Sequence, residues 1–167
     1  IDEARFPNLG RGSFEGKKYE FKGGILGQTV EIKARGRRSK KAKLLNVIER
    51  SSLEKGSPCP HFEKCGGCSY QTLSYEDELK YKKDLIEKLF KEHGIERELE
   101  IIPSPVHKFY RNKMEYTFGD EYKDGPLALG LHVKNRFHEI VNTTDCNIVD
   151  GDFNKIRSQV RNYFEKI

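Results

Sequence analysis

Short runs of strand-forming residues alternate with glycines over the first third of the chain. The runs lie at residues 18–21, 29–33 and 44–48, and each combines apolar side chains with polar neighbours. Glycine recurs between them because a chain that turns tightly between short strands needs residues without a Cβ. Residues 1–52 are therefore predicted to form a small OB-like β-barrel of about five strands. Its corners are expected at Gly10, Gly12, Gly16, Gly23, Gly24, Gly27 and Gly36.

A helical pattern follows the cysteine-rich stretch. Ser74 with Asp77 three residues later has the form of a capping box, and Gly94 provides a stop. Acidic residues lie near the predicted start, where the helix dipole favours negative charge. The apolar positions are expected to mark the buried face of this helix, at Tyr75, Leu79, Ile86, Leu89 and Phe90.

From residue 100 to residue 141 the apolar period changes to two. Tyr110, Tyr116 and Phe118 alternate with charged or polar residues, and a second alternating run occupies residues 127–133. A third run covers residues 137–141. We predict an antiparallel sheet of three or four strands, which would carry Cys146 back towards the earlier cysteines.

The last pattern is helical again and begins after Asp150. Its apolar residues are three and four positions apart and predict a buried stripe. The fold class is then α+β and mostly β, with domains at residues 1–52 and 53–150 and the start of a further helix at 151–167. The buried stripe expected in this last helix consists of Phe153, Ile156, Val160, Tyr163 and Ile167.

Charge is distributed unevenly along the chain. The net charge is +5, but the first 50 residues hold 13 Lys and Arg against 6 Asp and Glu, a charge of +7, and the remainder carries −2. Such an asymmetry is typical of a protein that binds a polyanion. The segment with the highest density of Lys and Arg predicts contact with RNA phosphates, although a solvated loop is the alternative. Its basic residues are Lys33, Arg35, Arg37, Arg38, Lys40, Lys41 and Lys43.

The four cysteines, Cys59, Cys65, Cys68 and Cys146, are spaced C-x5-C-x2-C-x77-C and suggest one metal site. Three close cysteines and one distant cysteine are typical of iron–sulfur proteins, whereas four-cysteine zinc sites usually pair two C-x2-C motifs. Zinc, with His61 as a possible ligand, and two disulfides remain alternatives. No apolar run has the roughly 20 residues of a membrane helix, and no signal peptide opens the chain. A reducing, cytoplasmic location is expected.

Residues 59–71 resemble the cluster segment of the RNA (uracil-5-)-methyltransferases, which methylate uridines of ribosomal and transfer RNA. Residues 110–116 and 129–132 are similar to that family's central strands, and Cys146 falls where its fourth ligand lies. The resemblance implies a 4Fe-4S cluster on the four cysteines. It also implies a TRAM domain at residues 1–52, matched at residues 23–30 except for a missing proline. Residues expected to face the RNA are Arg111, Asn112, Lys113 and His132.

The family's chemistry needs a cysteine nucleophile, S-adenosylmethionine and a carboxylate base. With four cysteines committed to a metal, none remains as a nucleophile, and no glycine motif opens a βαβ unit for the methyl donor. We therefore expect the monomeric N-terminal and central part of such an enzyme, without catalytic residues, and rRNA rather than tRNA as the substrate. A zinc-stapled RNA-binding module is the non-enzyme alternative, and a radical S-adenosylmethionine methylthiotransferase fits worse because its three-cysteine spacing differs.

Overall fold

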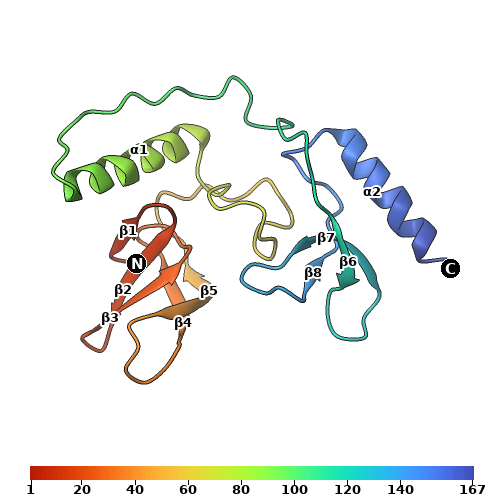
Figure 1. Cartoon of the computed structure of the whole chain (residues 1–167), viewed down its shortest axis with the longest axis horizontal. Coiled ribbons are helices and arrows are strands. Elements are labelled where there is room, and N and C mark those ends of the chain that lie inside the picture. Colours follow the sequence, from red (N-terminus) through yellow and green to blue (C-terminus); the bar gives the residue numbers. More distant parts are fainter. The chain divides into compact units, whose positions relative to one another are not determined.

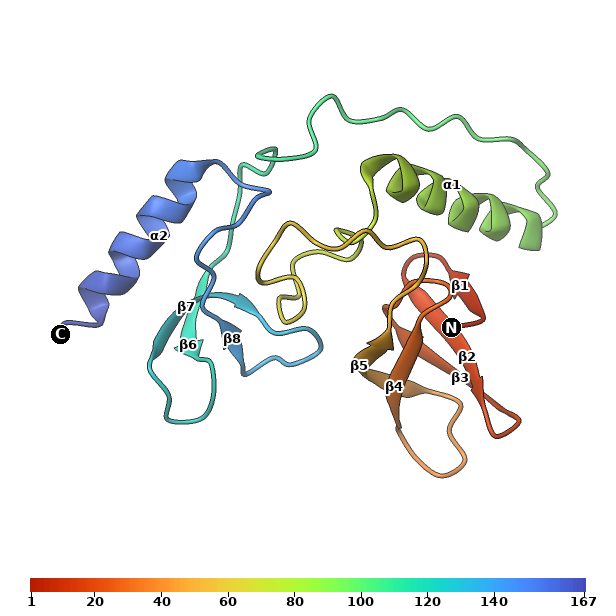
Figure 2. The ribbon, with the colours of Figure 1, turned by 180° about the vertical axis from the view of Figure 1, so that it is seen from behind.

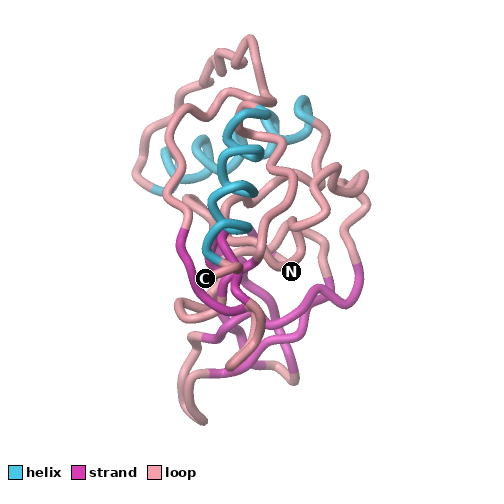
Figure 3. Tube along the Cα trace, turned by 90° about the vertical axis from the view of Figure 1, so that its right-hand side faces the viewer, coloured by secondary structure: helices cyan, strands magenta, loops and turns pink.

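The structure is a computed structural model that describes residues 1–167 and divides into two compact units (Figure 1). Unit 1 consists of Ile1–Gly56 and Thr72–Pro103, and unit 2 consists of Ser57–Gln71 and Ser104–Ile167. Each unit combines antiparallel strands with one helix. Loops connect these elements over much of the trace, as Figure 3 shows in pink. Neither helix has the length and apolar character needed to cross a membrane.

Unit 1 contains two antiparallel sheets. The three-stranded sheet joins β1 (Glu3–Arg5), β2 (Leu9–Phe14) and β3 (Lys17–Lys22) in that order, and the two-stranded sheet pairs β4 (Thr29–Ala34) with β5 (Ala42–Glu49). The three predicted strand runs lie in β3, β4 and β5 and are confirmed. Glu15 and Gly16 both have positive φ, 49° and 74°, as a two-residue turn between β2 and β3 requires.

The predicted OB-like barrel does not close, although the small β-rich domain is confirmed. The two sheets are linked by an isolated bridge between Glu20 and Lys41, where the Glu20 N–H donates to the Lys40 carbonyl at 2.8 Å. The register of β4 shifts between Thr29 and Val30 and again further along the strand. The two sheets remain separate, because this isolated bridge does not extend into a ladder between them.

The core of unit 1 lies around Phe21, Ile25 and Ala42, which are all buried. Gly10 is opposite Phe21 in the β2–β3 ladder. A Cβ on Gly10 would lie 2.6 Å from the Phe21 ring, so this glycine is required for packing inside a strand and not for a barrel corner.

The helix of unit 1, α1 (Tyr75–Glu92), begins and ends as the sequence predicts. The Ser74 side chain accepts the Asp77 N–H at 3.1 Å, and Gly94, with φ of 75°, donates to the Lys91 carbonyl. Its most buried residues are Tyr81 and Leu85, whereas the expected stripe is half-buried.

α1 belongs to the same compact unit as the N-terminal strands, and it contacts β1. The predicted boundary at residue 52 had instead grouped this helix with the cysteines. A hydrogen bond from the Leu26 N–H to the Tyr81 hydroxyl, at 3.1 Å, ties it to the strands. The predicted stripe is thus partly covered, and the most buried positions, Tyr81 and Leu85, lie beside it.

Unit 2 contains the three-stranded antiparallel sheet that the sequence predicts. Its order is β6 (Thr117–Asp120), β7 (Leu127–His132) and β8 (Ile140–Val141), and the strands lie side by side in Figures 1 and 2. Residues 110–116 form no strand of this sheet, contrary to the prediction. The Arg111 N–H donates to the Ile148 carbonyl at 2.8 Å, so this segment pairs with the chain that follows Cys146.

The helix of unit 2, α2 (Gly151–Phe164), exposes four of the five residues that were predicted to be buried, and the fifth, Phe153, is half-buried. Its buried residue is Arg157, 4% exposed, which donates to the carbonyls of Leu129 at 3.1 Å and Thr144 at 3.3 Å. These carbonyls need donors, and the arginine side of the helix supplies them. The outer stripe, 37–85% exposed, consists of Ile156, Val160, Tyr163 and Ile167.

Candidate metal centre

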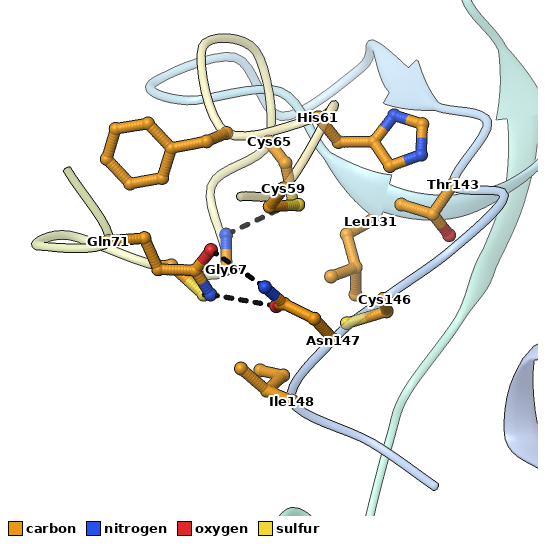
Figure 4. Close-up of a pocket in the computed structure, with 12 residues that line it drawn as sticks. Cys59, His61, Cys65, Gly67, Gln71, Leu131, Thr143, Cys146, Asn147 and Ile148 are labelled. Carbon is orange, nitrogen blue, oxygen red and sulfur yellow. Dashed lines mark hydrogen bonds between the residues drawn. The ribbon is translucent and has the colours of Figure 1, made fainter. Parts of the chain in front are cut away.

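The structure brings the four cysteines to one pocket of unit 2 (Figure 4). Cys59, Cys65 and Cys68 come from residues 57–71, called the cysteine loop below, and Cys146 comes from the segment between β8 and α2. The rest of the pocket wall is partly apolar and includes Phe62, Leu131 and Ile148. The pocket is partly open to solvent.

The cysteine loop is fixed to the end of β7 by backbone hydrogen bonds. The Gly66 N–H donates to the His132 carbonyl at 2.9 Å, and the Lys134 N–H donates to the Lys64 carbonyl at 2.8 Å. A Cβ on Gly66 would lie 3.1 Å from that same His132 oxygen, so a side chain here would push the loop from the strand. The paired glycines of the sequence thus allow a close backbone approach beside the thiols.

Cys146 is positioned by the first turns of α2. The Asn154 side chain accepts the Cys146 N–H at 3.0 Å and donates to the Cys146 carbonyl at 3.2 Å. Both backbone groups of this cysteine are therefore held by one amide, which fixes the position of its backbone beside the pocket.

Two polar links join the cysteine loop to the segment that carries Cys146. Gln71 and Asn147 exchange amide hydrogen bonds of 3.1 and 3.5 Å across the pocket (Figure 4). His61 Nε2 accepts the Thr144 N–H at 2.9 Å. Burial also lowers the pKa of His61. Because its Nε2 lone pair is already used, this nitrogen is not free to bind a metal, and His61 acts here as a loop anchor.

Hydrogen bonds and burial set the state of the thiols. The Cys68 sulfur accepts from Gln71 Nε2 at 3.2 Å, and the Cys65 sulfur accepts from the Gly67 N–H at 3.4 Å. Burial and the repulsion of the neighbouring cysteines raise the pKa of Cys68 to about 11, and burial raises the pKa of Cys65. Thiolates at these positions are costly unless a cation compensates their charge, as a bound metal does.

A lysine contributes positive charge beside the cysteine loop. Lys134 Nζ donates to the Phe62 carbonyl at 2.6 Å and lies 3.8 Å from the centre of the Phe62 ring. Burial lowers the pKa of Lys134, while nearby acidic groups, including three of the cysteines, act in the opposite direction. This ammonium favours the thiolate forms that metal binding requires.

The thiols surround the pocket and do not converge on one point. No three His, Cys, Asp or Glu side chains in the chain are arranged to hold a single metal ion. A tetrahedral zinc with bonds of about 2.3 Å needs its sulfur ligands within about 4 Å of one another. Four thiols are the donor set of either an iron–sulfur group or a zinc ion.

The basic residues predicted to bind RNA in unit 1 occupy the ends of β4 and β5 and the turn between them. Lys33 and Lys43 are directly opposite each other in the ladder, a pairing of like charges that is unfavourable without an anion. None of the seven residues forms a salt bridge. All are exposed except the half-buried Lys43. Of the aromatic residues on the neighbouring strands, Phe14 is exposed and Phe21 is buried.

The four residues predicted to face RNA in unit 2 do not form one strand surface. Arg111, Asn112 and Lys113 are exposed but lie outside the sheet. Lys113 pairs with Glu115 at 2.8 Å, an exposed contact of small energy. His132 ends β7 and is half-buried, with its Nδ1 buried and without a hydrogen-bond partner.

Four residues that hold the pocket together were not singled out from the sequence: Gln71, Lys134, Asn147 and Asn154. Each acts on a partner at least eight positions away, so no local spacing predicts it. The sequence signal available was only that polar residues follow Cys68 and Cys146.

The class of protein to which this chain is similar is the RNA methyltransferases. It is 49% identical over 167 residues, 98% of its length, to an uncharacterized RNA methyltransferase of Caldanaerobacter subterraneus. The corresponding proteins of Clostridium acetobutylicum and Clostridium tetani are 44% identical over 170 residues and 39% identical over 171 residues, each covering 99% of the chain. The chain spans 37% of the length of each of these three relatives, at their N-terminal end. No family model matches the chain.

Proposed function

We propose that this chain is the RNA-binding and iron–sulfur part of an S-adenosylmethionine-dependent 23S rRNA (uracil-5-)-methyltransferase, which methylates carbon 5 of a uridine. One observation carries the proposal. Cysteines from two distant segments line a single pocket in a chain that is 49% identical to a protein named as an RNA methyltransferase. The RNA-binding role is supported further by the exposed basic residues of unit 1, in the part that resembles a TRAM domain.

The proposed cofactor is a 4Fe-4S cluster held by Cys59, Cys65, Cys68 and Cys146. Four thiol donors, amide groups near two of the sulfurs and a neighbouring ammonium suit a group of negative charge. Four protein ligands leave no open iron position, so the chemistry that the cluster supplies is structural: it joins the cysteine loop to the segment before α2. This would give the RNA a rigid surface.

The methyl-transfer step is assigned to the part of the relatives that this chain does not span. All four cysteines line the metal pocket, which leaves none here to add to carbon 6 of the uracil. The chain also has only antiparallel sheets and offers no βαβ unit for the methyl donor. We therefore expect the 167-residue chain to transfer no methyl group to uridine when it is tested alone with S-adenosylmethionine.

Metal analysis of protein purified without oxygen tests the cofactor. We expect about four irons and four sulfides per chain, with visible absorption that is lost in air. One zinc and no iron would contradict the proposal and favour the alternative of a zinc-stapled RNA-binding module. Replacing His61 by Ala should not change the metal stoichiometry, because His61 is expected to be an anchor and not a ligand.

Equilibrium binding to rRNA and tRNA fragments at several salt concentrations tests the RNA assignment. Replacing Arg37 and Arg38 by Gln should weaken binding and lower the salt slope by roughly one for each phosphate that is no longer neutralised. The same exchange at Lys155, an exposed residue of α2 paired with Asp152, is the control. Equal binding by the double variant and the wild-type chain would show that the basic segment does not contact the RNA. Preference for the tRNA fragment would favour the tRNA branch of the family.

A further inference from the structure

The loop between β7 and β8 carries an aromatic ring that is both exposed and held in place. Phe137 is 77% exposed. Its ring nevertheless stacks on the His132 ring, with centroids 5.1 Å apart and an angle of 11° between the planes. The His138 ring meets it edge-on at 5.4 Å. Two histidines thus restrict the ring while most of its surface faces solvent.

The backbone beneath this ring is also fixed. The Val133 N–H donates to the Glu139 carbonyl at 2.9 Å, and the Arg136 N–H donates to the Val133 carbonyl at 3.0 Å. Asn135 allows this turn with a φ of 59°, a conformation that asparagine adopts more readily than most residues. Backbone hydrogen bonds therefore hold the loop on both sides of Phe137.

The same loop is attached to the cysteine loop. Val133 forms an isolated antiparallel bridge with Cys65, and the next residue, Lys134, donates its N–H to the Lys64 carbonyl. The aromatic ring is consequently presented from the part of unit 2 that carries three of the candidate metal ligands. Arg136, the residue before Phe137, adds a guanidinium that contacts both Glu139 carboxylate oxygens at 2.7 Å.

We propose that Phe137 is a stacking platform for an unpaired base of the RNA. Proteins recognise single-stranded RNA largely by stacking its bases on aromatic rings, and every base has a face that can stack. A ring already ordered by histidines loses little side-chain freedom when a base arrives, which favours binding. This inference rests on the proposed function, because that function supplies RNA as the ligand.

The proposal gives His132 a role that differs from the sequence expectation. His132 was expected to face the RNA directly, but its ring lies against Phe137 and its Nδ1 is buried. In the proposed arrangement the base stacks on Phe137, and His132 supports that ring from the protein side. His132 is thus a positioning residue.

Binding of a fluorescein-labelled single-stranded RNA of about ten nucleotides, containing uridine and adenosine, tests the platform. Phe137→Ala should weaken binding roughly 5- to 100-fold, since loss of one stacked base has an effect of that order. Phe137→Trp should retain the affinity. The dependence of affinity on salt should be the same for all three proteins, because no charge is removed.

Tyr122, which is 63% exposed in the turn between β6 and β7, provides a matched control in the same unit. Tyr122→Ala should bind the RNA as the wild-type chain does. Equal affinity of Phe137→Ala and wild type would overturn the platform and leave the proposed function standing. Absence of RNA binding by the wild-type chain would overturn both.

A fluorescence measurement separates stacking from an indirect effect on folding. The chain has no tryptophan, so Phe137→Trp introduces a single reporter at the proposed platform. RNA should quench this fluorescence on the same titration curve as the binding signal, and a Tyr122→Trp reporter should remain unquenched. RNA binding without any change at residue 137 would overturn the proposal.

Discussion

The helices of the two units carry apolar residues at similar spacing but pack in opposite ways. In unit 1, α1 buries Tyr81 and Leu85. In unit 2, α2 buries Arg157 and leaves the outer stripe exposed. An apolar pattern therefore shows that a helix is amphipathic, but it does not show which face the rest of the chain covers.

The difference extends to what surrounds each helix. The strands of unit 1 form longer ladders, including six residue pairs between β2 and β3, whereas β7 and β8 share two. Unit 2 has an apolar centre at Ile140 and Val149, but its outer connections are amides, a buried guanidinium and thiols. Unit 2 should consequently depend on polar anchors and on bound metal in a way that unit 1 does not.

The largest expected effect is the loss of metal from unit 2. Cys146→Ser, or removal of metal by a chelator, should destabilise unit 2 by roughly 5 kcal/mol or more, because structural metal binding contributes directly to folding. Amide hydrogen exchange in the metal-loaded protein measures this for each unit separately. Exchange should rise at residues 57–71 and 143–149 and stay unchanged at β2 and β3. Unchanged protection, together with unchanged RNA affinity, would reject a structural role for Cys146.

A smaller effect is expected when one helix anchor is removed. Arg157→Met leaves the Leu129 and Thr144 carbonyls without this donor and should cost about 2–4 kcal/mol. Leu85→Ala is the counterpart in α1 and should cost about 2–5 kcal/mol through the cavity it creates. Hydrogen exchange should locate the first loss in unit 2 and the second in unit 1. An increase in stability with Arg157→Met would show that the buried guanidinium destabilises the fold and is not an anchor.

The sequence predicted features that depend on neighbouring residues. The ends of α1 followed from Ser74 and Gly94, because capping is a local interaction. The strands β3, β4, β5 and β7 followed from local alternation. The spacing of the cysteines also placed Cys146 with the other three, and the structure brings all four to one pocket. The metal that they hold stays a prediction.

Features that depend on distant partners were missed. Residues 110–116 alternate like a strand, but backbone groups near Ile148 pair with them outside the sheet. The predicted barrel failed for a similar reason, since it required ladders between strands of the two sheets, which are linked by an isolated bridge. The role of Asn154 could not be predicted from the sequence, because its side chain binds the backbone of Cys146, which lies before the helix. The periodicity of a sequence predicts whether one segment is a helix or a strand. These contacts instead depend on where two distant segments lie relative to each other.

The smallest effect is expected on the exposed face of α2. Ile156 is 60% exposed, so Ile156→Glu should change the free energy of unfolding by less than about 0.5 kcal/mol. Leu85→Glu places the same charge at a buried position of α1 and should unfold unit 1, because an unpaired carboxylate cannot be accommodated in the core.

Thermal melts of the two variants therefore measure directly which face of each helix is covered. A large loss of stability with Ile156→Glu would mean that the outer stripe is buried in solution, and sedimentation at several concentrations would then show whether a second copy of the chain covers it. A stable monomer with an unchanged melting temperature would instead show that Ile156 faces solvent, as the structure has it.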